Sequence, residues 1–85
     1  MKEILHTERR CEGLSLTYTL LHHRHEGEWL YGIRIREESG GRAKEIFLDA
    51  LTGRRGEAER FFTLFSDGLV TVSGAEDVLY EIQYS

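Results

Sequence analysis

Eight consecutive residues organise the rest of this chain: Trp29-Leu30-Tyr31-Gly32-Ile33-Arg34-Ile35-Arg36. Large apolar residues alternate here with smaller or charged ones, and turn-forming residues lie on both sides, which is the pattern of a strand with one buried face. We therefore predict that this stretch is the central strand of a small sheet, and that the flanking segments pair with it or pack on it.

The preceding segment, residues 14–24, has the same period of two, because leucine and tyrosine alternate with serine and threonine. Glu26-Gly27 separates the two segments and suits a two-residue hairpin turn. Counting outward from this turn predicts the cross-strand pairs Tyr18–Ile35, Leu20–Ile33, His22–Tyr31 and Arg24–Trp29. The large apolar residues of these pairs then share one face, which a shift of one residue would prevent.

A second hairpin follows from Gly40-Gly41, since glycine tolerates the positive φ that both central positions of a type I′ turn require. Pairing about this turn predicts the pairs Ile35–Ile46, Ile33–Leu48, Tyr31–Ala50, Glu37–Lys44 and Arg36–Glu45. Apolar residues meet apolar residues, and acidic residues meet basic ones, in a single register. The sequence thus predicts a three-stranded antiparallel meander with strands over about 14–24, 28–38 and 42–50.

After the third strand the apolar period becomes helical. One apolar stripe, made of Ala58 and three phenylalanines up to Phe65, predicts a helix over about 53–67, with Thr52 as N-cap and Gly68 as the C′ residue. A second helix is predicted over about 74–83 from a capping box, with Ser73 at the N-cap and Glu76 three residues later.

The segment 74–83 has an alternative, because apolar residues from Val78 to Tyr84 also alternate with a period of two, as in a strand. The capping box favours the helix. The predicted class is therefore α+β, with both helices packed on one face of the meander.

Composition limits the possibilities further. The 85 residues allow one domain, 1–85, with residues 1–13 expected either as a frayed connector or as an edge segment. A net charge of −4 argues against binding to nucleic acid, and no apolar run approaches the roughly 20 residues of a membrane span. The one cysteine, Cys11, cannot form an internal disulfide, which is typical of the reducing cytoplasm.

The order of these parts resembles a known family. Tyr31-Gly32-Ile33-Arg34-Ile35, the acidic hairpin after it, the amphipathic helix and Asp77-Val78-Leu79 are similar to a small family of uncharacterised bacterial domains of unknown function, found mainly in Gram-positive anaerobes. The resemblance covers residues 14–83. It implies the order strand–strand–strand–helix–helix and supplies no catalytic residues.

Catalytic chemistry has no candidate in this sequence. The serines lack a paired histidine, Cys11 lacks a base, and the carboxylates are scattered. We expect no enzyme activity and no cofactor. The weak candidates for a metal site are His23, His25 and Glu28 at the first hairpin tip, since His23 and His25 share a face and Glu28 lies opposite His25; a solvated turn is the alternative.

The two faces of the meander differ in what they suggest. Trp29, Tyr31, Tyr18 and His22 share one face, either as core under the helices or as the lining of a ligand pocket. Three large apolar residues surround a glycine on the other face, where an uncovered sheet should be polar. The predicted partner-binding residues on that face are Leu21, Leu30, Gly32, Arg34 and Phe47.

These residues predict a small cytoplasmic protein-interaction or regulatory domain that binds an unidentified protein, or a second copy of itself, through the open sheet face. The alternative explanation for this face is that residues 1–13 fold over it. The other classes of function left open are a metal- or small-ligand-binding module at the histidine-rich tip, and a small inhibitor protein from a mobile element.

Overall fold

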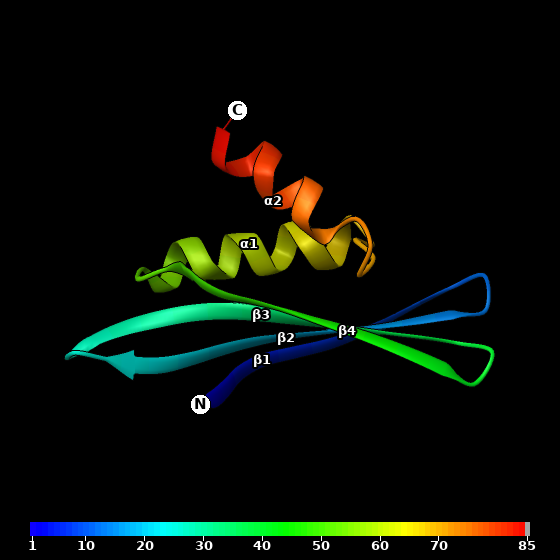
Figure 1. The fold of residues 1–85 in the computed structure, drawn as a ribbon, viewed down its shortest axis with the longest axis horizontal. Coiled ribbons are helices and arrows are strands. Elements are labelled where there is room, and N and C mark those ends of the chain that lie inside the picture. The colour runs from blue at the N-terminus through cyan, green and yellow to red at the C-terminus, as the bar shows by residue number, and fades with distance from the viewer. Residues whose placement is uncertain (85) are drawn as a thin grey trace.

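The structure, a computed structural model, describes residues 1–84. It contains one antiparallel sheet in the order β1-β2-β3-β4, followed by two helices (Figure 1). The bounds are β1 Lys2–Cys11, β2 Leu14–His25, β3 Glu28–Ser39, β4 Arg42–Thr52, α1 Arg55–Asp67 and α2 Ala75–Tyr84. The predicted α+β class is confirmed, but the prediction of three strands is wrong, because the sheet has four.

The additional strand, β1, pairs with β2 through a two-residue turn at Glu12-Gly13. Glu12 and Gly13 have φ of 49° and 80°, almost the values of Glu26 and Gly27 in the next turn, so the same dipeptide makes the same turn twice. The strand lies at the edge of the sheet, and eight of its ten residues are exposed. Its polar composition therefore hides the period of two, although the repeated Glu-Gly dipeptide was a visible signal.

The predicted register is confirmed throughout the first hairpin and over most of the second. One pair is wrong, because Tyr31 lies opposite Thr52 and not opposite Ala50. The ladder between β3 and β4 is irregular at this point, and Ala50 has a left-handed φ of 52° while its N–H donates to Asp49 Oδ1 at 2.8 Å. A local bulge of this kind shifts every later pair.

Helix α1 confirms the predicted helix but differs at both ends. It begins at Arg55, and Thr52 Oγ1 accepts the N–H of Arg54, at 3.1 Å, in the turn before the helix. Gly68 is not the C′ residue, since Leu69 holds the left-handed position with φ of 51°. The N–H of Val70 donates to the carbonyl of Phe65 at 3.1 Å, which completes a Schellman motif around Leu69.

The predicted second helix is also confirmed, and the strand alternative is excluded. Helix α2 begins at Ala75, so Ser73 lies one residue before the N-cap position and the predicted capping box is not formed there. Thr71 Oγ1 instead accepts the N–H of Gly74 at 3.3 Å, in the turn that leads into the helix.

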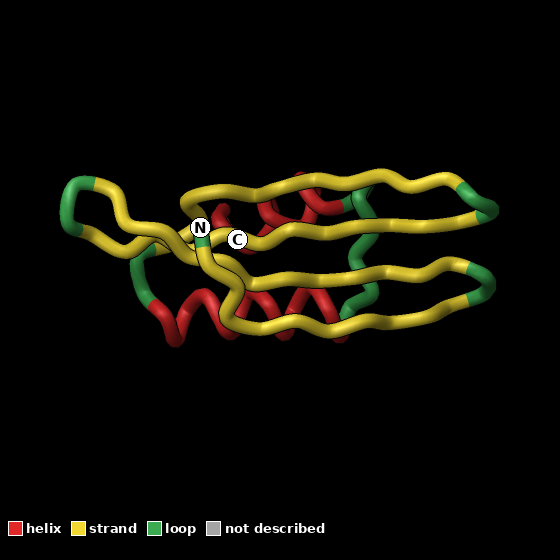
Figure 2. The backbone as a smooth tube through the Cα atoms, turned by 90° about the horizontal axis from the view of Figure 1, so that it is seen from below, coloured by secondary structure: helices red, strands yellow, loops and turns green. Residues whose placement is uncertain are grey.

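Both helices lie on the same side of the sheet, as Figure 1 shows, and Figure 2 places them behind opposite halves of it. Helix α1 lies next to the strands, whereas α2 rises away from them toward its C-terminal end. The core between sheet and helices consists of Leu16, Tyr18, Leu20, Tyr31, Ile33, Ile35, Leu48, Ala58, Phe61, Phe62, Phe65 and Ala75.

Two hydrogen bonds fasten the link between the helices to the sheet. The Tyr18 hydroxyl donates to the carbonyl of Val70 at 2.8 Å, and Glu37 Oε1 accepts the N–H of Val72 at 3.1 Å. Burial raises the pKa of Tyr18 to about 12, because the ionised phenolate would lie in the core. The carbonyl of Val70 and the N–H of Val72, both in partly buried residues, thereby have hydrogen-bond partners.

Candidate functional site

The sheet face turned away from the helices, here called the outer face, carries all five predicted partner-binding residues. They come together on three neighbouring strands: Leu21 of β2 lies opposite Gly32 of β3, and Arg34 of β3 lies opposite Phe47 of β4. Leu30 lies two residues before Gly32, on the same face of β3. Strand β1 extends the sheet beside β2 instead of folding over this face.

Gly32 is a gap in the middle of the outer face, and the ring of Phe47 fills it. A Cβ atom on Gly32 would lie 3.0 Å from Phe47 Cε1 and 2.8 Å from the carbonyl oxygen of Leu48. A glycine within a strand allows close approach of another backbone or ring, and here the ring belongs to the neighbouring strand.

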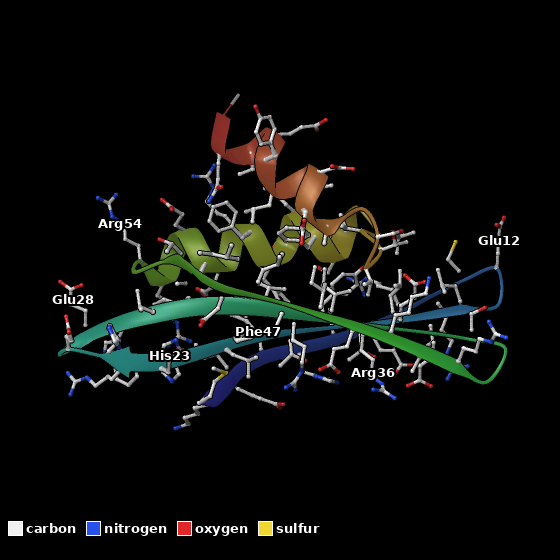
Figure 3. All side chains as sticks on the ribbon, in the orientation of Figure 1. Glu12, His23, Glu28, Arg36, Phe47 and Arg54 are labelled. Carbon is white, nitrogen blue, oxygen red and sulfur yellow. The ribbon has the colours of Figure 1, made fainter. Side chains whose placement is uncertain are left out.

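Two polar bridges cross the same region. Arg34 Nη2 of β3 reaches over β2 to Glu3 Oε1 of β1, at 3.0 Å. His23 Nε2 of β2 reaches over β3 to Asp49 Oδ1 of β4, at 3.1 Å. Figure 3 shows His23 and Phe47 on the side of the sheet away from the helices.

These contacts explain why part of the outer face is buried although no helix or strand covers it. Leu21 is 4% exposed and Thr19 is 2% exposed, and the Thr19 hydroxyl lies 3.1 Å from His6 Nδ1. Phe47 keeps 38% of its surface exposed, and Leu30 is half-buried. Of the five predicted contact residues, Leu21 and Gly32 are therefore already buried by their own chain.

Charged side chains surround what remains exposed. Arg36 on β3 pairs with Glu38 at 2.8 Å and with Glu45 of β4 at 3.7 Å. Together with the Arg34–Glu3 ion pair and the His23–Asp49 contact, these pairs form a polar rim. The outer face thus has a small apolar patch, Phe47 on the edge strand β4 and Leu30 on β3, bordered by these polar pairs.

The histidine-rich tip places the weak metal candidates as the register predicted, with His25 opposite Glu28. His23 is held by Asp49 on β4 and lies on the outer face. Within residues 1–84, no three His, Cys, Asp or Glu side chains converge as a metal site would need.

On the helix side of the same hairpin tip, two stacked rings and one guanidinium group form a cluster that we call the aromatic tip. It consists of His22, Trp29 and Arg24. The His22 and Trp29 rings are parallel to within 12°, with centroids 4.4 Å apart, and Arg24 Cζ lies over the indole at 5.0 Å. Tyr18 and Tyr31 are buried core, but Trp29 is 42% exposed. The four predicted aromatic-cluster residues therefore divide between core and surface.

His22 has an unusual environment. Its Nδ1 atom is buried and has no hydrogen-bond partner among the described residues. Loss of hydration lowers the pKa of His22, and the positive charges of Lys2, Arg55 and the chain's N-terminal ammonium lower this pKa further. The imidazole is consequently neutral at pH 7.

A shallow groove of about 510 Å³ lies between α1, the end of α2 and Leu51. Its apolar lining includes Phe61, Leu64 and Ile82, and Leu64 is 51% exposed. No nucleophile–base pair lies in this lining. Cys11 is exposed at the end of the first hairpin.

No protein-family model matches the chain, and the searches of curated proteins and of solved structures likewise find no match. The family resemblance described from the sequence therefore stays a prediction. Neither helix within the described residues is long and apolar enough to cross a membrane.

Proposed function

We propose that this protein is a small non-enzymatic interaction or regulatory domain of the cytoplasm, and that it binds a protein partner, or a second copy of itself, through the outer face. The observation that carries the proposal is the exposure of Phe47. A large aromatic side chain on the edge strand β4 stays 38% exposed, on a sheet face that no helix covers.

The arrangement around Phe47 supports this proposal. Protein interfaces concentrate binding energy in a few central aromatic or large apolar side chains, surrounded by polar residues that remain near solvent. Phe47 and Leu30 supply such a centre, and the paired charges of Arg34 and Arg36 supply such a rim. The close approach of the Phe47 ring to Gly32 would lower the cost of ordering this side chain on binding.

The test replaces Phe47 by Asp, with Leu64→Asp as the matched control on the helix side, where Leu64 is also exposed. We expect Phe47→Asp to remove self-association in sedimentation from micromolar to millimolar protein, or to remove a partner captured from the source cells. Leu64→Asp should leave both unchanged. Urea titration of each variant checks that folding persists.

A wild type that is monomeric at millimolar concentration, and that captures the same proteins as Phe47→Asp, would contradict the proposal. Loss of association in both variants would indicate a binding surface other than the outer face. This result would also contradict the proposal.

A further inference from the structure

The region around His22 gathers positive charge although the chain as a whole is acidic, with a net charge of −4. Lys2 of β1 lies directly opposite His22 in the ladder. Arg55, the first residue of α1, lies close enough for its charge to act on the imidazole. Arg24 is two residues further along β2, on the same face as His22. Three separate segments thus bring cations to one place.

These cations are poorly neutralised by the chain itself. Lys2 and Arg24 have no ion pair with a carboxylate among residues 1–84, and the one pair of Arg55, with Glu59, is long at 3.9 Å. The charges that act on His22 are all positive. Arg34 and Arg36 of the sheet are paired with carboxylates, whereas Arg42 of β4 has no ion pair among residues 1–84. Like charges held near one another repel, and a bound anion would relieve that repulsion.

The start of helix α1 and the ring of Trp29 also belong to the surroundings of these cations. Helix α1 begins here with Arg54 at its N-cap position and no side-chain cap on its first N–H groups, and Glu57 is the one acidic residue of its first turn. Figure 3 shows Arg54 pointing away from the sheet, and it is not part of the cluster. The Arg24 Cζ atom lies over the indole of Trp29 at 5.0 Å, a cation–π contact that leaves the guanidinium N–H groups able to donate hydrogen bonds.

We infer that the aromatic tip is a binding site for a phosphoryl group, held by Lys2, Arg24 and Arg55 beside His22. A phosphoryl group carries about two negative charges and three acceptor oxygens, so it matches several cations from different directions, as a single carboxylate does not. The site lies on the helix side of the sheet and does not depend on the outer face or its partner.

The experiment uses the full chain and the fluorescence of Trp29, its only tryptophan. The probes are inorganic phosphate, a nucleoside monophosphate and a phosphoserine peptide, each against potassium chloride of equal ionic strength. We expect a saturable change of indole emission with a phosphate probe. The double variant Lys2→Gln with Arg55→Gln should weaken binding roughly tenfold or more, since each cation contributes a charge-assisted hydrogen bond.

Arg60→Gln, on α1 but outside the cluster, is the matched control and should bind as the wild type does. Saturation by inorganic phosphate would identify the free ion as sufficient; a response to the nucleotide or the peptide alone would identify an organic phosphate as the source. A bound phosphate should also raise the pKa of His22, measured by proton NMR, because it neutralises the surrounding cations.

The inference is overturned if all three probes act no more strongly than potassium chloride. It is also overturned if the double variant, shown by circular dichroism to be folded, binds phosphate as tightly as Arg60→Gln does.

Discussion

The two sides of β3 are covered by different means. On the helix side, Ile33 and Ile35 are fully buried beneath a separate layer of structure. On the outer side, side chains of β2 and β4 reach toward each other over Gly32 and cover Leu21. The first cover consists of buried apolar side chains, whereas the second is one side chain thick and ends in exposed polar and charged groups. Burial of a residue therefore contributes a different free energy to folding on each side.

The largest expected effect separates these two sides directly. Ile33→Ala should lower the free energy of unfolding by about 2–5 kcal/mol, because it leaves a cavity beneath the helices. Arg34→Ala, the next residue on the opposite face, should cost about 1 kcal/mol or less, since the Arg34–Glu3 pair is partly exposed and screened by water. Urea denaturation measures both. Similar losses in the two variants would show that the outer cover is as important as the core.

The second prediction concerns the gap that lets the outer cover form. Gly32→Ala should destabilise the fold by roughly 1–3 kcal/mol, because the new methyl group would meet the backbone of Leu48 and displace Phe47. Gly56→Ala is the control, since open space surrounds it near the start of α1 and alanine favours helix by up to about 1 kcal/mol. If thermal denaturation finds Gly32→Ala as stable as the wild type, the close packing over Gly32 is not what holds the outer face.

The smallest expected effect is a pH dependence at the aromatic tip. The pKa of His22 is lower in the folded chain than in the unfolded chain, so the unfolded chain binds more protons at mildly acidic pH. Stability should therefore fall as the pH drops below about 6.5, the usual value of histidine, and stop falling once folded His22 is also protonated. His22→Gln should reduce this slope in urea titrations repeated between neutral and acidic pH. An unchanged slope would assign the dependence to other groups.

The hairpins were predictable because two-residue turns transmit register over a whole strand. Glu26-Gly27 and Gly40-Gly41 each fixed the pairs on both sides, and the prediction failed only near Ala50, where the ladder between β3 and β4 becomes irregular. Counting along a sequence assumes that each residue of one strand pairs with one residue of the next. It therefore cannot predict a local irregularity in the ladder. The sequence leaves residues 1–13 open between a frayed connector and an edge segment for another reason, because an exposed edge strand such as β1 needs no apolar alternation.

The candidate sites show a similar division. The register correctly assembled Leu21, Leu30, Gly32, Arg34 and Phe47 on one face, because strand pairing determines which residues share a face. It could not predict that Arg34 crosses β2 to reach Glu3, since a long side chain has many rotamers and its partner was expected to lie in a connector. The exposure of Trp29 depends on where α1 begins relative to the hairpin tip, which periodicity does not specify.

The strand order has a consequence for how the molecule forms. Each strand pairs with the strand that precedes it in the chain, and each connection is a two-residue turn. Each pair of strands can therefore begin to pair at its own turn and extend outward, so little loop-closure entropy is lost. The chain also contains no proline, which removes the slowest common isomerisation from its folding. The sheet can grow one strand at a time in the order of synthesis, and the helices that bury its inner side are made last.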